Sequence, residues 1–185
     1  MKRVTVFCGS SHGAKVEYTQ AAQTLGRALA HRGIDLVYGG SSIGTMGELA
    51  RSALDAGGHV IGVIPRLLVD REVAFAALPD LRIVETMTER KLLMADLADA
   101  FITLPGGIGT MDEFFEMVSW TQLGLQQKRC GLVNVCGYYD RLVEFLKHAV
   151  DERFIRAESP PIILIDPSPE GLLDQLAAPE NLPGL

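Results

Sequence analysis

The sequence contains little cysteine and few aromatic residues, and it has no excess of basic charge. Three cysteines among 185 residues do not form the disulfide framework of a small secreted protein. The formal net charge of −6 disfavours broad nucleic-acid or membrane-surface binding, which usually requires a basic face. We therefore expect no nucleic-acid and no membrane partner, whereas a local cluster of donors can still bind a small anion.

Long apolar runs and targeting signals are also lacking. No apolar stretch of the sequence reaches the roughly 18 residues that a membrane span needs. Residues 1–3 lead into the apolar run 4–8, which is too short for the core of a signal peptide. The four histidines are scattered, and no Cys/His spacing resembles a zinc site. These features predict a cytoplasmic protein with reduced thiols and no metal.

The remaining composition is that of a compact folded chain. Hydrophobic residues make up 48% of it, and the length fits one domain over 1–185. Short β-branched runs alternate with helical patterns, which favours a parallel sheet covered on both faces. Right-handed crossovers then make an α/β, Rossmann-like, doubly wound parallel sheet the leading topology.

The pattern places the elements as follows. Strands are expected at 4–8, 34–38, 59–64, 100–104, 131–135 and 162–165. Helices are expected at 16–32, 45–56, 86–97, 110–123, 139–153 and 170–176. The segment 66–79 is the one long irregular connection, and such loops are often functional.

Glycine-containing turns follow three of the expected strands, at 9–11, 39–44 and 105–110. Ligands of open parallel sheets bind beyond the carboxyl ends of the strands. Glycine lets the backbone approach a ligand closely, and a following helix start offers unpaired N–H groups to phosphate. Any one of these loops could be a simple turn. Three at the same edge predict a nucleotide site, centred on the loop Pro105–Thr110.

The two best-known phosphate loops do not fit this chain. A P-loop needs a lysine followed by Ser/Thr after its last glycine, but Gly109 is followed by Thr110 and Met111. The dinucleotide fingerprint G-x-G-x-x-G does not follow the first strand. We therefore do not expect NAD as a cofactor.

Two glutamates share a stripe with bulky apolar residues on the helix after this loop. Glu113 and Glu116 lie at helical spacing from Met117 and Trp120. Acids near a helix N-terminus can simply complement the helix dipole, and that role suffices for Asp112. The apolar stripe and the adjacent glycine loop favour a functional role for Glu113.

Arg90 also lies on the apolar face of its predicted helix, with Leu93, Met94 and Leu97. A buried arginine requires an anionic partner. The residues leave two alternatives open: a catalytic role, or a structural ion pair with one of the two glutamates.

Four other residues are weaker candidates by residue type. His12 follows the first strand and could reach the site, although a lone histidine is usually not catalytic. Glu72 lies in the irregular loop, where a solvated acid is the simpler interpretation. Tyr138 and Tyr139 are expected to pack at a helix start.

Taken together, these motifs resemble the LOG (lonely guy) family, which is often labelled "possible lysine decarboxylase". The resemblance rests on Arg90-Lys91 and on the P-G-G-x-G-T-x-x-E motif of 105–113. It also includes the stretches 6–11, 35–40, 44–47, 60–65, 98–101 and 120–124, and runs from about residue 4 to residue 146. The combination of the two motifs is highly specific, unlike any single glycine loop.

The resemblance implies a phosphoribohydrolase. Such enzymes cleave the N-glycosidic bond of cytokinin riboside 5′-monophosphates, which are N6-modified AMP, to free base and ribose 5-phosphate, and they often accept AMP. The resemblance assigns catalysis to Arg90 and Glu113, needs no cofactor and implies a homodimer. It implies substrate contacts at Glu72, Lys91, Gly107, Ile108, Gly109, Thr110, Met111, Asp112 and Ser119. From the other two glycine loops we add Gly9, Ser10, Gly40 and Gly44 as substrate-binding positions.

The chain departs from the family pattern at two positions, and other functions compete. Ser41 stands where a third glycine is common, and Ser119 where threonine is common. The decarboxylase label conflicts with the chemistry, since a pyridoxal-phosphate enzyme needs a Schiff-base lysine and a much larger fold, and only Lys91 lies in a motif. The alternatives are a general AMP or nucleotide 5′-monophosphate nucleosidase and a non-catalytic nucleotide-binding module.

Overall fold

A parallel β-sheet forms the centre of the protein. The computed structural model describes residues 1–69, 71, 73–156 and 163–178. Its seven strands lie in the order β4-β3-β2-β1-β5-β6-β7, and every neighbouring pair is parallel. The strands are β1 (Arg3–Phe7), β2 (Asp35–Tyr38), β3 (Val60–Pro65), β4 (Asp80–Val84), β5 (Ala100–Thr103), β6 (Arg129–Val133) and β7 (Ile163–Asp166).

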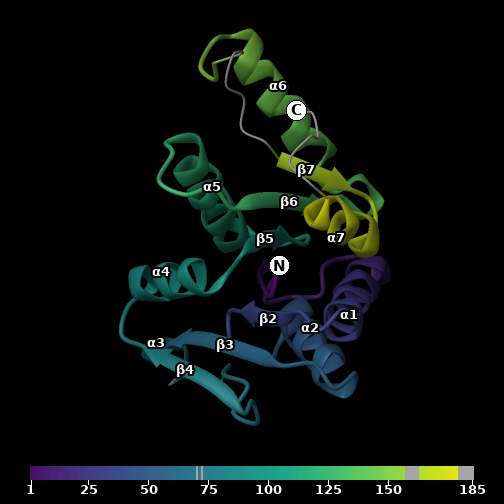
Figure 1. The fold of residues 1–185 in the computed structure, drawn as a ribbon, viewed down its shortest axis with the longest axis vertical. Helices are drawn as coiled ribbons and strands as arrows, with labels where there is room; N and C mark the ends of the chain where they lie inside the picture. Colours follow the sequence, from purple (N-terminus) through teal and green to yellow (C-terminus); the bar gives the residue numbers. More distant parts are fainter. Residues whose placement is uncertain (70, 72, 157–162, 179–185) are drawn as a thin grey trace.

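Helices cover both faces of this sheet (Figure 1). One hydrophobic cluster joins the sheet to α1 (Val16–His31), α2 (Gly44–Asp55) and α7 (Pro169–Ala177). A second cluster on the other face joins it to α4 (Met87–Leu97), α5 (Ile108–Gln122) and α6 (Asp140–Asp151). The expected α/β, doubly wound Rossmann-like class is therefore confirmed. Because the two helical layers bury both faces, a ligand can reach the sheet at the ends of its strands.

The chain reverses its winding direction between β1 and β5. Strands β1 to β4 extend the sheet to one side, and β5 to β7 extend it to the other. A crevice outside the carboxyl ends of the strands is expected at such a switch point. The three glycine loops follow β1, β2 and β5, which are neighbours in the sheet, so the expectation that they share one edge is confirmed.

The expectation that 66–79 is irregular was wrong at its start, and the expected elements left out a strand at 80–84. A short helix α3 (Arg66–Val69) opens this connection, and β4 (Asp80–Val84) follows it as an edge strand. The strand escaped notice because polar Asp80 and Arg82 alternate with apolar residues, and all of its residues stay at least partly exposed. Edge strands lack the continuous apolar pattern of buried parallel strands.

Most other boundaries agree to within two residues, with one difference that affects the site. Helix α5 begins at Ile108, not at Thr110, because Gly107 adopts an extended N-cap conformation. Glu113 consequently lies in the second turn of α5 and not in the first. Residue 162, where the last strand was expected to begin, lies outside the described residues.

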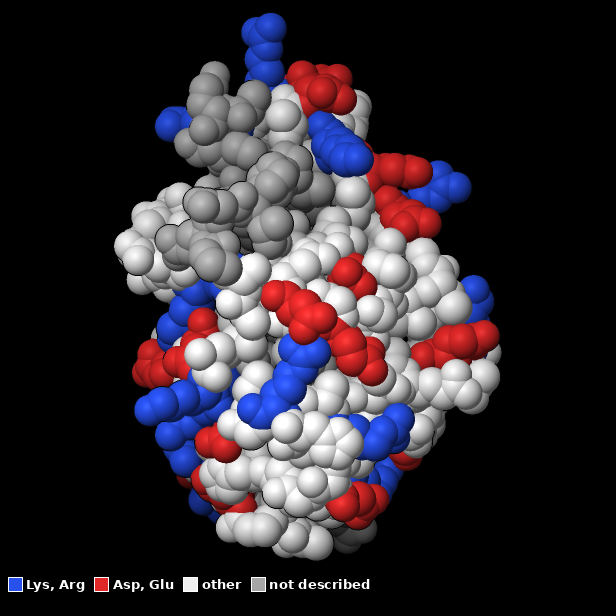
Figure 2. Space-filling view, turned by 45° about the vertical axis from the view of Figure 1, so that its right-hand side comes forward, with Lys and Arg blue, Asp and Glu red and all other residues white. Residues whose placement is uncertain are grey.

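Charges of both signs are interspersed on the face drawn in Figure 2, with no extended area of one sign. None of the helices in the described part of the chain is both long and apolar enough to cross a bilayer. The cysteines are free thiols, with Cys8 and Cys130 buried and Cys136 exposed.

Candidate active site

Arg90 and Glu113 meet in a buried ion pair between α4 and α5. Nη1 of Arg90 lies 3.1 Å from Oε1 of Glu113, and each side chain is only 8% exposed. The prediction that Arg90 faces inward beside an acid is thus confirmed, and its ion-pair partner is Glu113. A charge buried to this degree requires such a partner.

The guanidinium of Arg90 also reaches the ends of two strands. Its Nε donates to the carbonyl of Val63 at 3.1 Å, and its Nη2 donates to the carbonyl of Gly39 at 3.3 Å. A β-carbon on Gly39 would collide with Nη2, so only glycine leaves room for the guanidinium there. Three nitrogens held by three different segments fix the orientation of Arg90.

The environment of Glu113 sets its protonation. Burial raises the pKa of Glu113 above its usual range, while the nearby charge of Arg90 acts to lower it. Its neighbours along α5, Phe114 and Met117, are fully packed in the second hydrophobic cluster. The carboxylate is therefore held rigidly in a largely dry environment, where its charge acts strongly on a nearby ligand.

Lys91 bridges α4 and α5 next to this pair. Its Nζ lies 2.9 Å from Oε2 of Glu116 and 3.1 Å from Oδ2 of Asp112. Its side chain is 18% exposed, and the hydrogen bond to Glu116 raises the pKa of Lys91 despite partial burial. Lys91, Asp112 and Glu116 thus form a charged group at one side of Glu113, and the predicted substrate contacts Lys91 and Asp112 touch each other.

The loop after β5 leaves its donors available. The first bond inside α5 runs from the Met111 N–H to the Gly107 carbonyl, at 3.1 Å. The amides of Ile108, Gly109 and Thr110 precede it and have no carbonyl within the helix to bond. Gly107, Ile108 and Gly109 are exposed, and β-carbons on Gly107 and Gly109 would meet nothing within 4 Å. Open space above free amides is the geometry of an anion site.

Two of these loop positions have packing roles. The buried Thr110 side chain lies so close to Gly106 that a β-carbon on Gly106 would collide with it. Met111 is half-buried and packs against the second cluster. Packing against Thr110 therefore requires glycine at position 106. No contact among the described residues requires glycine at positions 107 and 109.

The first two glycine loops are bound to each other instead. The Thr45 hydroxyl and the Met46 N–H, both on α2, donate to the Gly9 carbonyl at 3.0 and 3.2 Å. The Thr45 N–H donates to the Ser11 carbonyl at 3.4 Å. Gly44, with a φ of 59°, packs directly against the backbone of Ser10. Donors in the first turn of α2 are therefore already bonded to protein carbonyls. The N-terminus of α5 is more open than that of α2.

The irregular connection lies against the second glycine loop. The Phe75 N–H donates to the Gly40 carbonyl at 2.8 Å, and the Ser42 N–H donates to the Val73 carbonyl at 2.9 Å. The Ser41 hydroxyl, at the position where the family usually has glycine, accepts from the Ile43 N–H at 3.3 Å. Glu72, a predicted substrate contact, lies outside the described residues.

Ser119 lies on α5 well away from the phosphate loop. It is exposed on α5, and a rise of about 1.5 Å per residue puts it about 16 Å along the helix from Ile108. The structure therefore does not bring Ser119 together with the phosphate loop of its own chain. The other predicted contacts among the described residues lie in or beside the glycine loops, and their roles toward a ligand stay predictions.

The sequence did not indicate that two further residues, Tyr138 and Cys8, lie beside the loops. The Tyr138 hydroxyl donates to the Gly106 carbonyl at 2.6 Å, so Tyr138 does more than pack at a helix start. Together with His12, Tyr18 and the loop backbone it lines a cavity of about 300 Å³.

Cys8 lies close enough to Glu113 and Arg90 for their charges to act on it, and burial raises the pKa of Cys8 to about 12. The Cys8 thiol is therefore neutral and not a nucleophile at neutral pH.

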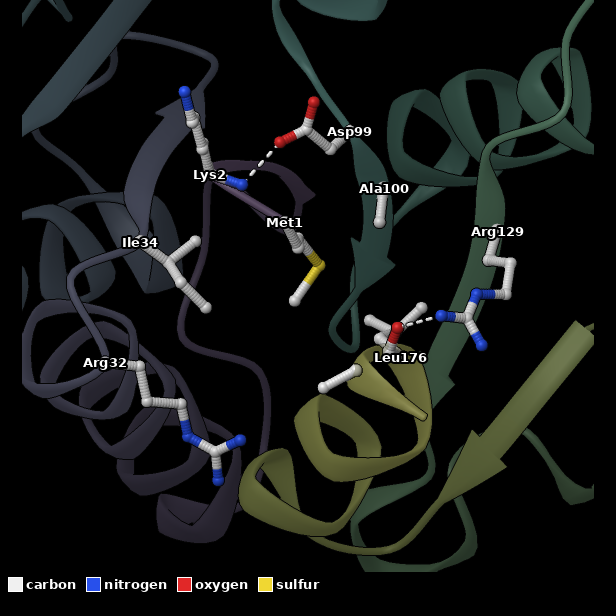
Figure 3. A pocket seen from close by; sticks show the side chains of 9 residues that line it. Met1, Lys2, Arg32, Ile34, Asp99, Ala100, Arg129 and Leu176 are labelled. Atoms are coloured by element: carbon white, nitrogen blue, oxygen red, sulfur yellow. Dashed lines mark hydrogen bonds between the residues drawn. The ribbon is translucent and has the colours of Figure 1, made fainter. Parts of the chain in front are cut away.

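A larger cavity, of about 730 Å³, lies at the opposite end of the sheet (Figure 3). Both of its arginines already have partners: Arg129 donates to the Leu176 carbonyl, and Arg32 pairs with Asp174 at 2.7 Å. It lacks a glycine loop and a buried acid–base pair, so the chemistry favours the β1/β5 edge. In the part of the chain that the structure describes, no three His, Cys, Asp or Glu residues group as metal ligands.

Comparison with known proteins shows the family of the chain. A family profile described as "Possible lysine decarboxylase" matches residues 46–176. Cytokinin riboside 5′-monophosphate phosphoribohydrolase LOG of Oryza sativa subsp. japonica is 48% identical over 175 residues, 95% of this chain and 72% of that protein. The chain belongs to the LOG family. The Arabidopsis thaliana enzyme LOG1, of the same name, is also 48% identical, over 95% of this chain and 82% of its own length.

Solved structures share the fold of this LOG-family chain at lower identity. The molybdenum cofactor carrier protein of Chlamydomonas reinhardtii superposes with a TM-score of 0.70 at 21% identity, covering 96% of this chain and 99% of that one. The molybdenum cofactor binding protein of Rippkaea orientalis gives 0.69 at 21% identity, covering 95% and 96%. At such identity the likeness concerns the fold alone.

Proposed function

We propose that this LOG-family protein hydrolyses the N-glycosidic bond of cytokinin riboside 5′-monophosphates, and of AMP, to free base and ribose 5-phosphate. The observation that carries the proposal is the buried pair of Arg90 and Glu113, one helical turn beyond open loop amides. The two residues lie in the two motifs on which the resemblance to the LOG family rests, and phosphoribohydrolases of that family are 48% identical to this chain.

The chemistry requires a fixed negative charge near the sugar. Cleavage of the C1′–N9 bond builds positive charge on the ribose, as in glycoside hydrolysis. The carboxylate of Glu113 would stabilise that charge and position the attacking water. The N-terminus of α5 would bind the 5′-phosphate and hold the sugar in place. Phosphate binding is thus the anchor, and the bond broken lies at the other end of the ribose.

The contacts of Arg90 favour a positioning role. All three of its guanidinium nitrogens contact protein atoms, on Glu113, Val63 and Gly39. In this interpretation Arg90 orients the Glu113 carboxylate and favours its ionised form, and Lys91 and Asp112 contact the nucleotide at the side of the loop.

The proposal is tested by incubating the protein with N6-isopentenyladenosine 5′-monophosphate or with AMP and separating the products by chromatography. We expect base and ribose 5-phosphate in equal amounts. Glu113→Gln, which keeps the shape and removes the charge, should lower the rate about 10²–10³-fold. Glu144→Gln, the same change on the exposed surface of α6, is the matched control.

Three outcomes would contradict this proposal in different ways. Base release that survives Glu113→Gln would remove Glu113 from the reaction. Equal kcat/KM for AMP and the N6-modified nucleotide would favour a general nucleosidase. Binding of a nucleotide without cleavage would favour the non-catalytic module.

We also propose that the protein acts as a homodimer in the cytoplasm. The exposed residues Phe115, Ser119 and Leu123 recur every four positions on one stripe of α5, and Leu123 is 69% exposed. A second copy covering this stripe would bury the apolar side chains and bring Ser119 toward a site not its own. Sedimentation velocity tests this: Leu123→Asp should shift a dimer toward monomer, whereas Lys147→Asp on α6 should not.

The free thiols support the proposed location, because the cytoplasm is a reducing compartment.

A further inference from the structure

The orientation of the peptide bond between Gly106 and Gly107 decides where the phosphate loop directs the Gly107 N–H. The peptide bond between Gly106 and Gly107 is planar and trans, so its carbonyl and its N–H point in opposite directions. Both flanking residues are glycines, which have wide conformational freedom. A rotation of this peptide would turn the Gly107 N–H away from a ligand.

Tyr138 holds the carbonyl half of this peptide. Its hydroxyl donates to the Gly106 oxygen at 2.6 Å, a short and well-formed hydrogen bond. The ring is itself held on two sides, edge-to-face against Tyr18 of α1 at 5.5 Å and against Tyr139 at 4.9 Å. Tyr138 therefore reaches the loop from the α1 side with a fixed ring.

The backbone below the ring is also fixed. Tyr139 is the N-cap residue of α6. Its N–H donates to the Asn134 side chain at 2.7 Å, and that side chain donates to Asp140 at 2.7 Å. The turn between them uses positive φ at Cys136 and Gly137, of 53° and 69°. Tyr138 thus stands on a rigid turn between β6 and α6.

We propose that Tyr138 is a positioning residue that directs the Gly107 N–H toward the 5′-phosphate of the nucleotide. This inference rests on the proposed function, in which the α5 N-terminus binds that phosphate. With the carbonyl held on the Tyr138 side, the N–H points the opposite way, away from α1. No atom lies within 4 Å of a β-carbon built on Gly107, so a phosphate has room to approach this residue and accept from its N–H.

The adjacent tyrosine provides a matched control. The Tyr139 hydroxyl donates to the Leu104 carbonyl at 2.7 Å, a hydrogen bond of the same kind to the same loop. The peptide that follows Leu104 ends on Pro105, which has no N–H to direct. Removing the Tyr139 hydroxyl therefore leaves a buried carbonyl without its donor, yet misdirects no phosphate-binding amide.

The test is calorimetric titration of the full chain with ribose 5-phosphate, and with ribose as the phosphate-free control. We expect Tyr138→Phe to raise the Kd for ribose 5-phosphate about three- to ten-fold, the value of one lost hydrogen bond. Its melting temperature should change little, since Tyr138 is 42% exposed. Tyr139→Phe should lower the melting temperature by a few degrees and leave the Kd within about two-fold.

Steady-state kinetics give a second readout, in which Tyr138→Phe should raise KM for AMP and leave kcat within about two-fold. An unchanged Kd in Tyr138→Phe would overturn the inference, as would equal effects of the two variants or a wild type that does not bind ribose 5-phosphate. If the wild type binds ribose 5-phosphate in a Tyr138-dependent way but releases no base, the proposed hydrolysis fails and this inference stands.

Discussion

The guanidinium of Arg90 lies directly against the backbone of Gly39, in space that any side chain at position 39 would occupy. A residue of the second glycine loop therefore shapes the catalytic pair without facing the ligand. The site depends on packing behind it as well as on the residues that line it.

Gly39→Ala should displace Arg90 and lower kcat/KM by at least about tenfold, because Glu113 loses its fixed partner. Gly57→Ala is the control: its φ of 79° makes alanine strained, but no atom lies within 4 Å of the new carbon. It should cost about 1 kcal/mol of stability and leave kcat/KM unchanged. Comparable activity losses in the two variants would show that general destabilisation is the cause.

Arg90→Lys should behave as a disruptive change. A single ammonium cannot replace three nitrogens that contact Glu113, Val63 and Gly39. We expect the unfolding free energy to fall by about 1–3 kcal/mol and kcat to fall sharply. Denaturant unfolding and base-release assays measure both effects. Arg66→Lys, at an exposed pair with Glu85, should change stability by at most about 0.5 kcal/mol. Full activity in Arg90→Lys would contradict the positioning role.

The dependence of kcat/KM on pH should report Glu113. Because burial raises its pKa, the acid limb should have its midpoint above about 4.3, the ordinary value for glutamate. Arg90 acts to lower this pKa, so Arg90→Gln should move the limb to still higher pH. A limb that moves toward lower pH in that variant would argue against ionised Glu113 as the active form.

Lys91→Met should leave Asp112 and Glu116 without their shared cation. Two unneutralised carboxylates near the phosphate loop would repel the nucleotide, so KM should rise about tenfold or more. The double variant Lys91→Met/Asp112→Asn should recover part of this loss. If it recovers nothing, the loss comes entirely from the missing contact of Lys91 with the nucleotide, and charge balance has no part in it.

Much of this site was predictable because the sequence signals were local. Apolar runs and glycine turns located the three loops, and helical spacing placed Arg90 and Glu113 on inward faces. Their pairing required knowledge of the strand order, since the two residues lie on different helices. β4 went unrecognised because an edge strand is only half-buried.

Tyr138 shows the limit of such reasoning. Its acceptor is a backbone carbonyl 32 residues away, which no side-chain pattern reveals. The same holds for Gly39, whose need for glycine comes from the guanidinium of a residue 51 positions later. Contacts between a side chain and a distant backbone become visible only when the chain is folded.

The occupied amides at the start of α2 bear on how selectivity can change. With those donors engaged by the Gly9 and Ser11 carbonyls, a nucleotide in the proposed site has one preferred polarity, phosphate toward α5. The base then lies at the end of the nucleotide that points away from the α5 N-terminus. Preference for one N6-substituent over another could diverge through the surrounding loops alone, with the hydrolytic centre left untouched.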